Sequence, residues 1–206
     1  DSLLRLKVGS SLSIAELLRV SALLRVALRA SDYGKRDHEP GEEDDALDVM
    51  FRELAPVVSL AKEIDRCILS EEEIADDASN GLRSVRRAMK TAAEKIRTQL
   101  NSLVVNSRTY LQDGVITMRN GRYCVPVKQE YRGNVNGIIH DQSSTGSTLF
   151  IEPAAVVELN NKLRELEAKE ADEIQIILAN LSMACAEHIY ELKTDMEILP
   201  KLDFIF

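Results

Sequence analysis

The sequence predicts a mainly α-helical protein with an elongated helical base, a long antiparallel two-helix arm and a small antiparallel β-tip. Apolar residues recur at steps of three and four from residue 71 to 111 and again from 153 to 199, a helical period. Only the stretch between them, 112–152, is typical of β-structure. Two long helices joined by a compact connector pack best as an antiparallel pair, which defines the arm.

The base begins with residues 1–12, an amphipathic stretch that ends at three small residues, Gly9-Ser10-Ser11. Ser13 and Glu16 have the spacing of a capping box and predict a helix to about Ala30. Its buried face is expected to carry Leu17, Leu24 and Leu28.

A polar stretch, 31–45, is expected to form a loop in which His38 is exposed to solvent. Beyond it we expect a short helix over 44–54. Pro56 suits the first turn of a further helix that reaches about Leu69.

The arm begins at Ser70-Glu-Glu-Glu73, which has the pattern of a second capping box and starts the helix over 71–111. A helix of that length measures roughly 60 Å. Pro153 stands at the start of the returning helix, and Pro200 is expected to end it after about Leu199. Met196, Glu170 and His188 fall on its apolar face, where His188 is expected to be a packed, hydrogen-bonded residue rather than a ligand.

The β-tip is built around Asn120-Gly121, a strong hairpin signal that joins runs 115–119 and 122–127. Gly137–Gln142 and Ser147–Ile151 are two further predicted strands, linked by a turn over 143–146. Strand order is left open, although the missing amide of Pro126 favours an edge strand.

These elements define four regions: a helical core over 1–70, an outgoing lever helix over 71–111, a clamp-like tip over 112–152, and a returning lever helix with the end of the core over 153–206. No apolar run approaches the ~18 residues that a membrane span needs, and no signal peptide is visible. Three widely separated cysteines favour buried thiols in a reducing cytoplasm. The absence of an initiator Met and the apolar last residues suggest a piece of a longer protein.

Charge is unevenly distributed along this acidic chain. Residues 1–82 and residues 133–206 each carry a net charge of −8, whereas residues 83–132 carry +8. Solubility alone does not require such segregation, so the basic zone indicates an anionic partner.

The basic zone supplies the candidate nucleic-acid-binding residues, which would contact the phosphate backbone without reading sequence. They are Arg119, Arg122, Lys128 and Arg132 on the tip, supported by Arg83, Arg87 and Lys90 on the outgoing helix. An alternative for the helix is that acidic residues of the returning helix, 165–173, pair with its cations. Tyr123 and Tyr131 could stack on bases or form the core of the small sheet.

Catalytic patterns are absent. The chain has no phosphate-binding Gly-x-x-x-x-Gly-Lys-Ser/Thr loop and no His-Glu-x-x-His zinc motif. His140, Asp141, Ser143 and Ser144 contain the residue types of a hydrolytic triad, but neighbours on a strand point to opposite faces. Asp141 and the serines are expected to order the turn instead.

The run TMRNGRYCVPVKQEYR at 117–132, then GIIHD at 137–141 and GSTLFIEP at 146–153, followed by Asn160-Asn161, resembles the second bacterial branch of the MutS superfamily, the MutS2 family. The resemblance extends from Leu3 to Phe206. It implies a core, lever and reduced clamp-like segment. A P-loop ATPase domain that uses ATP and Mg, and a small C-terminal endonuclease domain, would belong to other parts of the parent protein.

The resemblance also implies homodimers formed through the ATPase domains, binding of branched DNA with suppression of recombination, and binding and splitting of collided ribosomes. No catalytic residue of the family matches a position of this chain. We therefore expect a cytoplasmic, non-catalytic segment without a cofactor of its own that engages DNA or ribosomal RNA through its basic tip. The alternative is a structural coiled-coil arm that mediates protein–protein contact or dimerisation.

Overall fold

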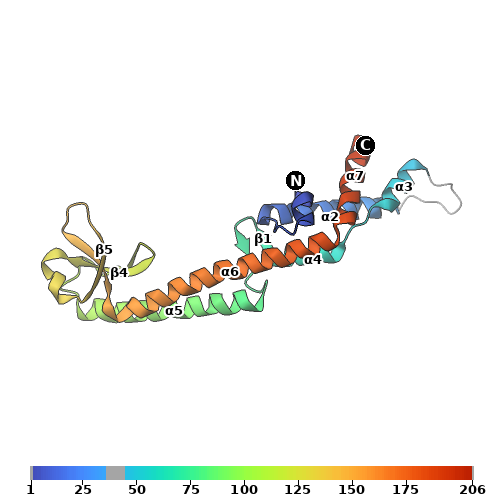
Figure 1. Ribbon diagram of the computed structural model, residues 1–206. Coiled ribbons are helices and arrows are strands. Elements are labelled where there is room, and N and C mark those ends of the chain that lie inside the picture. Colours follow the sequence, from blue (N-terminus) through green and yellow to red (C-terminus); the bar gives the residue numbers. More distant parts are fainter. Residues whose placement is uncertain (1, 36–44, 206) are drawn as a thin grey trace. The chain divides into compact units, whose positions relative to one another are not determined.

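The computed structural model describes residues 2–35 and 45–205, which form a mainly helical protein with small antiparallel sheets, as predicted (Figure 1). The chain divides into two compact units. Unit 1 comprises Asp1–Asn80 and Glu173–Phe206, and unit 2 comprises Gly81–Asp172. Helix α5 (Asn80–Asn106) begins at the boundary and lies in unit 2 from Gly81 onward. Helix α6 (Val157–Glu187) belongs to unit 2 as far as Asp172 and to unit 1 from Glu173.

Unit 1 is formed by helices that pack around an aliphatic core. It contains α1 (Ser2–Lys7), α2 (Ile14–Gly34), α3 (Ala46–Glu53), α4 (Val58–Cys67), the second part of α6, and α7 (Ile189–Ile205). Leu17 and Leu24 of α2 and Ile64 of α4 are almost completely buried. Leu28 is only partly buried.

The capping box predicted at the start of α2 is present. Glu16 donates its backbone N–H to the Ser13 hydroxyl, and the Glu16 carboxylate accepts a 2.8 Å hydrogen bond from the Ser13 backbone. The hydrogen bonds from Ser13 and from Ser2 lower the pKa of Glu16 to about 2. The helix runs four residues beyond Ala30, because Gly34 at its end packs against Phe51. Residues 31–34 of the predicted loop are therefore helical, and residues 36–44, with His38, lie outside the described residues.

The second predicted capping box is wrong. Ser70 ends a short strand, β1 (Ile68–Ser70), which pairs with β2 (Glu73–Ile74). The helix predicted over 71–111 begins instead at Asn80 and ends at Asn106, so it measures roughly 40 Å rather than 60 Å. Burial of Ile68 and Ile74 stabilises the turn between the strands, and this tertiary contact overrides the local helix signal.

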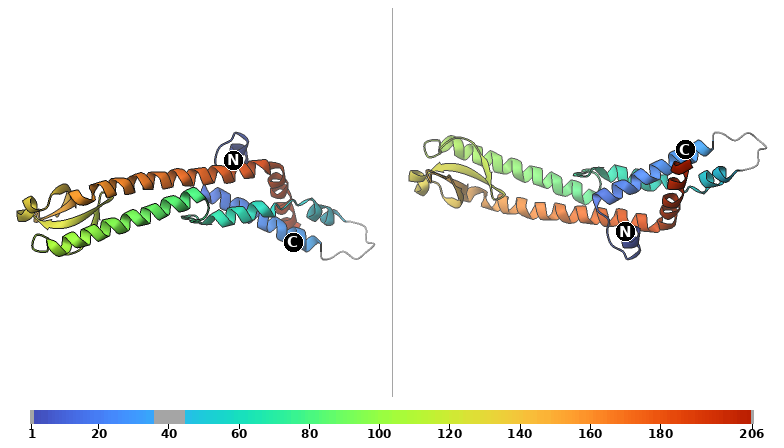
Figure 2. Two further views of the ribbon diagram at one scale, coloured as in Figure 1. Left: turned by 90° about the horizontal axis from the view of Figure 1, so that it is seen from below. Right: turned by 90° about the horizontal axis from the view of Figure 1, so that it is seen from above.

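Unit 2 contains α5 and the first part of α6, which run antiparallel and side by side (Figures 1 and 2). They share an apolar core with a four-stranded antiparallel sheet. Its strands, in the spatial order β3-β4-β6-β5, are β3 (Thr117–Arg119), β4 (Arg122–Lys128), β5 (Gly137–Gln142) and β6 (Thr148–Pro153). Two 3₁₀ helices, η1 (Gln129–Asn134) and η2 (Ala154–Val156), complete it. The core joins Ile96 of α5 and Leu163 of α6 to Val125 and Ile151 of the sheet.

The Asn120-Gly121 hairpin is confirmed. Both residues have positive φ angles, 51° and 70°, as a tight two-residue turn between twisted strands requires. Pro126, by contrast, lies on the central strand β4 and is buried. Its carbonyl accepts a hydrogen bond from the Gln112 backbone, so its missing amide faces the segment around Gln112 rather than β6.

The returning helix is interrupted. α6 ends at Glu187, and α7 begins after His188 and continues through Pro200, so proline does not end the helix here. Pro200 is exposed, where water can solvate the carbonyl that loses its partner. His188 is half-exposed rather than core, with Nδ1 3.4 Å from a Glu191 carboxylate oxygen, and Met196 is exposed. None of the helices in the described ranges is both long and apolar enough to cross a bilayer.

Candidate nucleic-acid interface

The tip candidates Arg119 and Arg122 face each other across the hairpin, as directly paired residues of β3 and β4. Arg122 donates a 3.0 Å hydrogen bond to the Glu152 carboxylate. The Nε atom of Arg119 lies 3.1 Å from an Asp141 carboxylate oxygen, and its guanidinium lies 4.0 Å from the centre of the Phe150 ring. Both cations are therefore partly neutralised within the sheet.

The other two tip candidates also contact their own fold. Lys128 donates to the Thr109 carbonyl at 3.3 Å. Arg132 donates to the carbonyls of Val135 and Gly137 at 3.2 and 3.3 Å, which ties η1 to the start of β5. The acceptors are neutral carbonyls, and the Lys128 ammonium also lies 5.9 Å from the centre of the Tyr131 ring.

A buried carboxylate that sequence reasoning missed holds this end of the sheet together. Glu152 on β6 is fully buried, and it accepts hydrogen bonds from Arg122 and from the Asn160 side chain, the latter at 2.7 Å. His140 Nε2 lies 2.6 Å from the other carboxylate oxygen. Burial acts to raise the pKa of Glu152, but the hydrogen bonds with His140, Asn160 and Arg122 together lower it. In the sequence, Glu152 is an acid that directly follows the predicted strand Ser147–Ile151.

The first turns of α6 fix the hairpin from the other side. The Asn160 amide oxygen accepts from the Tyr123 N–H at 3.2 Å, and its nitrogen donates to the Tyr123 carbonyl at 3.3 Å. Arg164 donates to the carbonyl of Asn120 in the turn. Tyr123 packs against the core of unit 2, and Tyr131 stacks near Tyr110 with ring centres 5.3 Å apart, which favours the core interpretation of these tyrosines.

The candidate cations on α5 differ from those of the tip in their exposure and in their ion pairing. Arg87 and Lys90 are exposed on α5. Arg97, about two helical turns beyond Lys90, is exposed as well. No ion pair involves these three side chains within the described part of the chain. We call Arg87, Lys90 and Arg97 the cationic face. Arg83 is exposed but has an interaction partner, so it is not part of this set.

The alternative in which acids of α6 neutralise the α5 cations holds for Arg86. Arg86 donates to Glu170 at 2.7 Å between the two helices. Glu165 and Glu167 pair instead with cations of their own helix, Lys162 and Arg164. The cationic face therefore stays available to an external anion.

Curated proteins similar to this chain match it along its whole length. The sequence is 56% identical to endonuclease MutS2 of Lachnospira eligens and 55% identical to that of Agathobacter rectalis, over 207 residues in each case. It is 44% identical to endonuclease MutS2 of Clostridium perfringens over 206 residues. Each match covers 100% of this chain. The chain matches a segment of endonuclease MutS2 along its whole length.

The MutS2 segment spans 26% of the length of these relatives. No family model matches it. The sequence resemblance to MutS2 is thus confirmed by similarity to a segment of each of these relatives.

The His140 and Asp141 side chains of this MutS2 segment have separate partners, as expected from their positions on a strand. His140 meets Glu152, whereas Asp141 meets Arg119. The Ser143 hydroxyl accepts from the Thr148 N–H at 3.1 Å and so orders the turn before β6, as predicted. No group of three or more potential metal ligands occurs in the described ranges. Burial raises the pKa of each cysteine thiol to about 11, as expected for inert thiols.

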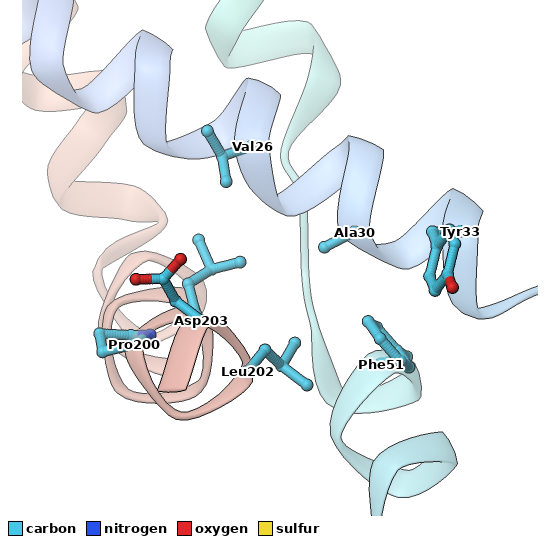
Figure 3. A pocket seen from close by; sticks show the side chains of 8 residues that line it. Val26, Ala30, Tyr33, Phe51, Pro200, Leu202 and Asp203 are labelled. Atoms are coloured by element: carbon cyan, nitrogen blue, oxygen red, sulfur yellow. The ribbon is translucent and has the colours of Figure 1, made fainter. Parts of the chain in front are cut away.

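A pocket of unit 1, of about 600 Å³, lies between α2, α3 and α7 (Figure 3). Tyr33 and Phe51 form one end, with ring centres 5.8 Å apart, and Leu202 and Pro200 form the other. Asp203 is the one charged residue of its lining. A single carboxylate in an apolar pocket does not by itself form an acid–base pair.

Proposed function

We propose that this MutS2 segment is a non-catalytic part of a MutS-type, ATP-dependent protein that engages the phosphate backbone of DNA or of ribosomal RNA. Branched DNA and recombination intermediates are the DNA substrates we have in mind. The observation that carries the proposal is the cationic face of α5, whose three charges have no ion-pair partner within the described residues. The relatives are named endonucleases, and an endonuclease acts on nucleic acid.

The geometry of the cationic face suits a polyanion. At 100° per residue, Arg87, Lys90 and Arg97 fall within a sector of roughly 80° on α5. From first to last they extend over roughly 15 Å of helix axis. That length corresponds to about four base steps of a duplex at 3.4 Å each, so the three side chains can meet several phosphates of one strand.

The tip residues would act as a second contact. An arginine has five N–H donors, so the single bond from Arg122 to Glu152 leaves others for a phosphate. Lys128 and Arg132 keep their full charge, because the groups to which they donate hydrogen bonds are neutral carbonyls. In this proposal the paired helices of unit 2 act as the lever and its sheet acts as the clamp-like tip. The parent protein, a homodimer in the cytoplasm, would supply ATP and Mg binding and nuclease activity from outside this segment.

The test is fluorescence-anisotropy binding of duplex DNA, a four-way junction and a structured RNA at ~50 and ~200 mM salt, where phosphate contacts lose most affinity. The variant is the triple reversal Arg87→Glu, Lys90→Glu and Arg97→Glu. The matched control reverses three exposed lysines elsewhere, Lys62, Lys169 and Lys201, and has the same net charge.

We expect the α5 variant to bind much more weakly and the control variant to lose little. Equal losses in the two variants would reduce the effect to net charge and reject the α5 site. Failure of the wild-type segment to bind at ~50 mM salt, together with self-association in sedimentation, would favour the structural coiled-coil arm instead. The ranking of the three nucleic acids decides between DNA and ribosomal RNA.

A further inference from the structure

Helix α5 carries hydrogen-bond acceptors beside its cationic face. Glu94 lies between Lys90 and Arg97 along the helix, and at 100° per residue it falls within the sector that the three cations define. Thr91 and Thr98, three residues before it and four residues after it, lie within roughly 40° of that sector. All three side chains are exposed. We call Thr91, Glu94 and Thr98 the acceptor row, which extends over roughly 10 Å of helix axis.

The two threonines are acceptors because their own hydrogens are already used. The Thr91 hydroxyl donates to the Arg87 carbonyl at 3.0 Å, and the Thr98 hydroxyl donates to the Glu94 carbonyl at 2.9 Å. A hydroxyl has one hydrogen to donate and two lone pairs, so each offers an external group its lone pairs only. An ionised carboxylate is acceptor-only as well. Every member of the row therefore requires a donor from its partner.

An ion pair within α5 does not explain Glu94. Lys90 stands four residues before it, but a lysine N-terminal to its glutamate is the less favourable order for such a pair. Within the described part of the chain, the Glu94 carboxylate has neither an ion pair nor a hydrogen bond. Cations and a carboxylate thus face solvent side by side on one helix.

The backbone of RNA matches both kinds of group, whereas the backbone of DNA matches only the cations. Phosphate oxygens accept hydrogen bonds from lysine and arginine. The sugar–phosphate backbone of DNA has no hydrogen-bond donor, so a carboxylate set among its phosphates is only repelled. RNA carries a 2′-hydroxyl on each sugar, which can donate as well as accept. One RNA strand can therefore bring phosphates to the cations and hydroxyls to the acceptors.

We propose that the acceptor row binds ribose 2′-hydroxyl groups and so makes the cationic face of α5 prefer RNA to DNA. Glu94 is the specificity-determining residue, because it accepts from a 2′-hydroxyl of RNA and repels the phosphates of DNA with no compensating bond. This inference rests on the proposed function, since the cations supply the affinity that the acceptor row then directs.

Three duplexes of one sequence test the role of the hydroxyl: RNA, RNA with 2′-fluoro sugars, and DNA. The fluoro duplex keeps the phosphates and the A-form shape of RNA, but its fluorine is small and cannot donate. Fluorescence anisotropy with this chain at ~50 mM salt measures the three affinities. We expect the wild type to bind RNA on the order of fivefold more tightly than 2′-fluoro RNA, which is the effect of a single hydrogen bond.

The variant Glu94→Gln assigns the preference to its residue. We expect it to bind DNA more tightly than the wild type does, because the repulsion is gone, and to lose most of the preference for RNA over 2′-fluoro RNA. Glu187→Gln is the matched control: Glu187 is exposed on α6 in unit 1, and its replacement changes the net charge equally. This control should keep the wild-type preference.

Equal binding of RNA and 2′-fluoro RNA by the wild type would overturn the inference about Glu94 and leave the phosphate contact in place. A preference that Glu94→Gln retains, or that Glu187→Gln loses to the same extent, would also overturn it. Failure of the wild type to bind any of the three duplexes would reject the proposed function, and this inference with it.

Discussion

Glu152 shows how a single buried side chain organises the sheet of unit 2. Its carboxylate joins Arg122 on β4, His140 on β5 and Asn160 on α6. A buried carboxylate is tolerated only when its lone pairs are used in this way. Arg122, which the sequence suggested as a phosphate ligand, therefore also has a structural role.

Glu152→Gln should destabilise the protein by about 2–4 kcal/mol, because a neutral amide leaves the buried donors poorly matched. Urea unfolding followed by circular dichroism measures the change. Asp141→Asn is the control, since the partly exposed pair of Asp141 with Arg119 should contribute less than about 1 kcal/mol. Similar losses in both variants would contradict the role given to Glu152.

The same carboxylate predicts a dependence on pH. The folded-state pKa of Glu152 is lowered, so its contribution is fully present above its unfolded pKa of about 4.3. It is lost as the pH falls from there through the folded-state pKa. The unfolding free energy of the wild type should thus decrease more steeply on acidification than that of Glu152→Gln. Parallel curves would show that Glu152 does not titrate as inferred.

Asp195 on α7 predicts the opposite sign. It is fully buried. One carboxylate oxygen accepts from the Ala55 N–H at 2.8 Å, and the other has no hydrogen-bond partner among the residues that the structure describes. Burial raises the pKa of Asp195. The folded protein is therefore most stable below the unfolded-state pKa of this group, and it loses stability as the pH rises from that value through the folded-state pKa. Asp195→Asn should raise the unfolding midpoint near pH 7 and have little effect near pH 3. An unchanged midpoint at pH 7 would show that the charge is accommodated.

At the scale of elements, the hairpin between β3 and β4 depends on local backbone chemistry and on a contact that is distant in sequence. Gly121 has φ 70°, which L side chains rarely adopt, and a Cβ there would lie 2.8 Å from the Arg164 guanidinium carbon. Arg164 in turn holds the Asn120 carbonyl. The turn is thereby fastened to α6.

Gly121→Ala should destabilise the protein by about 1–2 kcal/mol, from the strained φ together with displacement of Arg164. Gly133→Ala is the matched control, because nothing lies within 4 Å of a Cβ at that position. Thermal unfolding of the two variants separates these effects. A Gly121 variant as stable as the Gly133 variant would mean that the turn carries little of the strain.

At the scale of the whole molecule, charge segregation along the chain is the feature on which the proposed phosphate contact rests. The net charge of +8 over 83–132 is concentrated in unit 2, and its largest unpaired part is the cationic face of α5. The cations of the tip are held by internal contacts. Reversing them would disturb the sheet as well as any phosphate contact, so the α5 cations provide the cleaner test.

If all three cations of the face contact phosphates, neutralising them should reduce the salt dependence of binding. The slope of log K against log salt should become shallower by about 2–3 in the variant with Arg87→Gln, Lys90→Gln and Arg97→Gln. Anisotropy titrations at four salt concentrations measure it, and Lys62→Gln, Lys169→Gln and Lys201→Gln together serve as the control. An unchanged slope with weaker binding would indicate that the helix acts other than through phosphates.

Where the signal was local, the sequence by itself determined the structure of this protein. The Ser13 cap, the Asn120-Gly121 hairpin, β5 and the helical periodicity follow from the bonds and backbone angles that neighbouring residues allow. The cationic face also follows from sequence, because helical spacing sets which charges share a side.

Only the tertiary structure decided the rest. The Ser70 pattern has the letters of a helix start, yet the burial of Ile68 against Ile74 makes it a β-turn. Pro200 stays inside a helix because its surroundings are open to water. The partners of Arg119 and Arg122 lie 22 and 30 positions away in the chain, at Asp141 and Glu152. Contacts between distant residues depend on how the strands and helices pack, and no local pattern in the sequence encodes them.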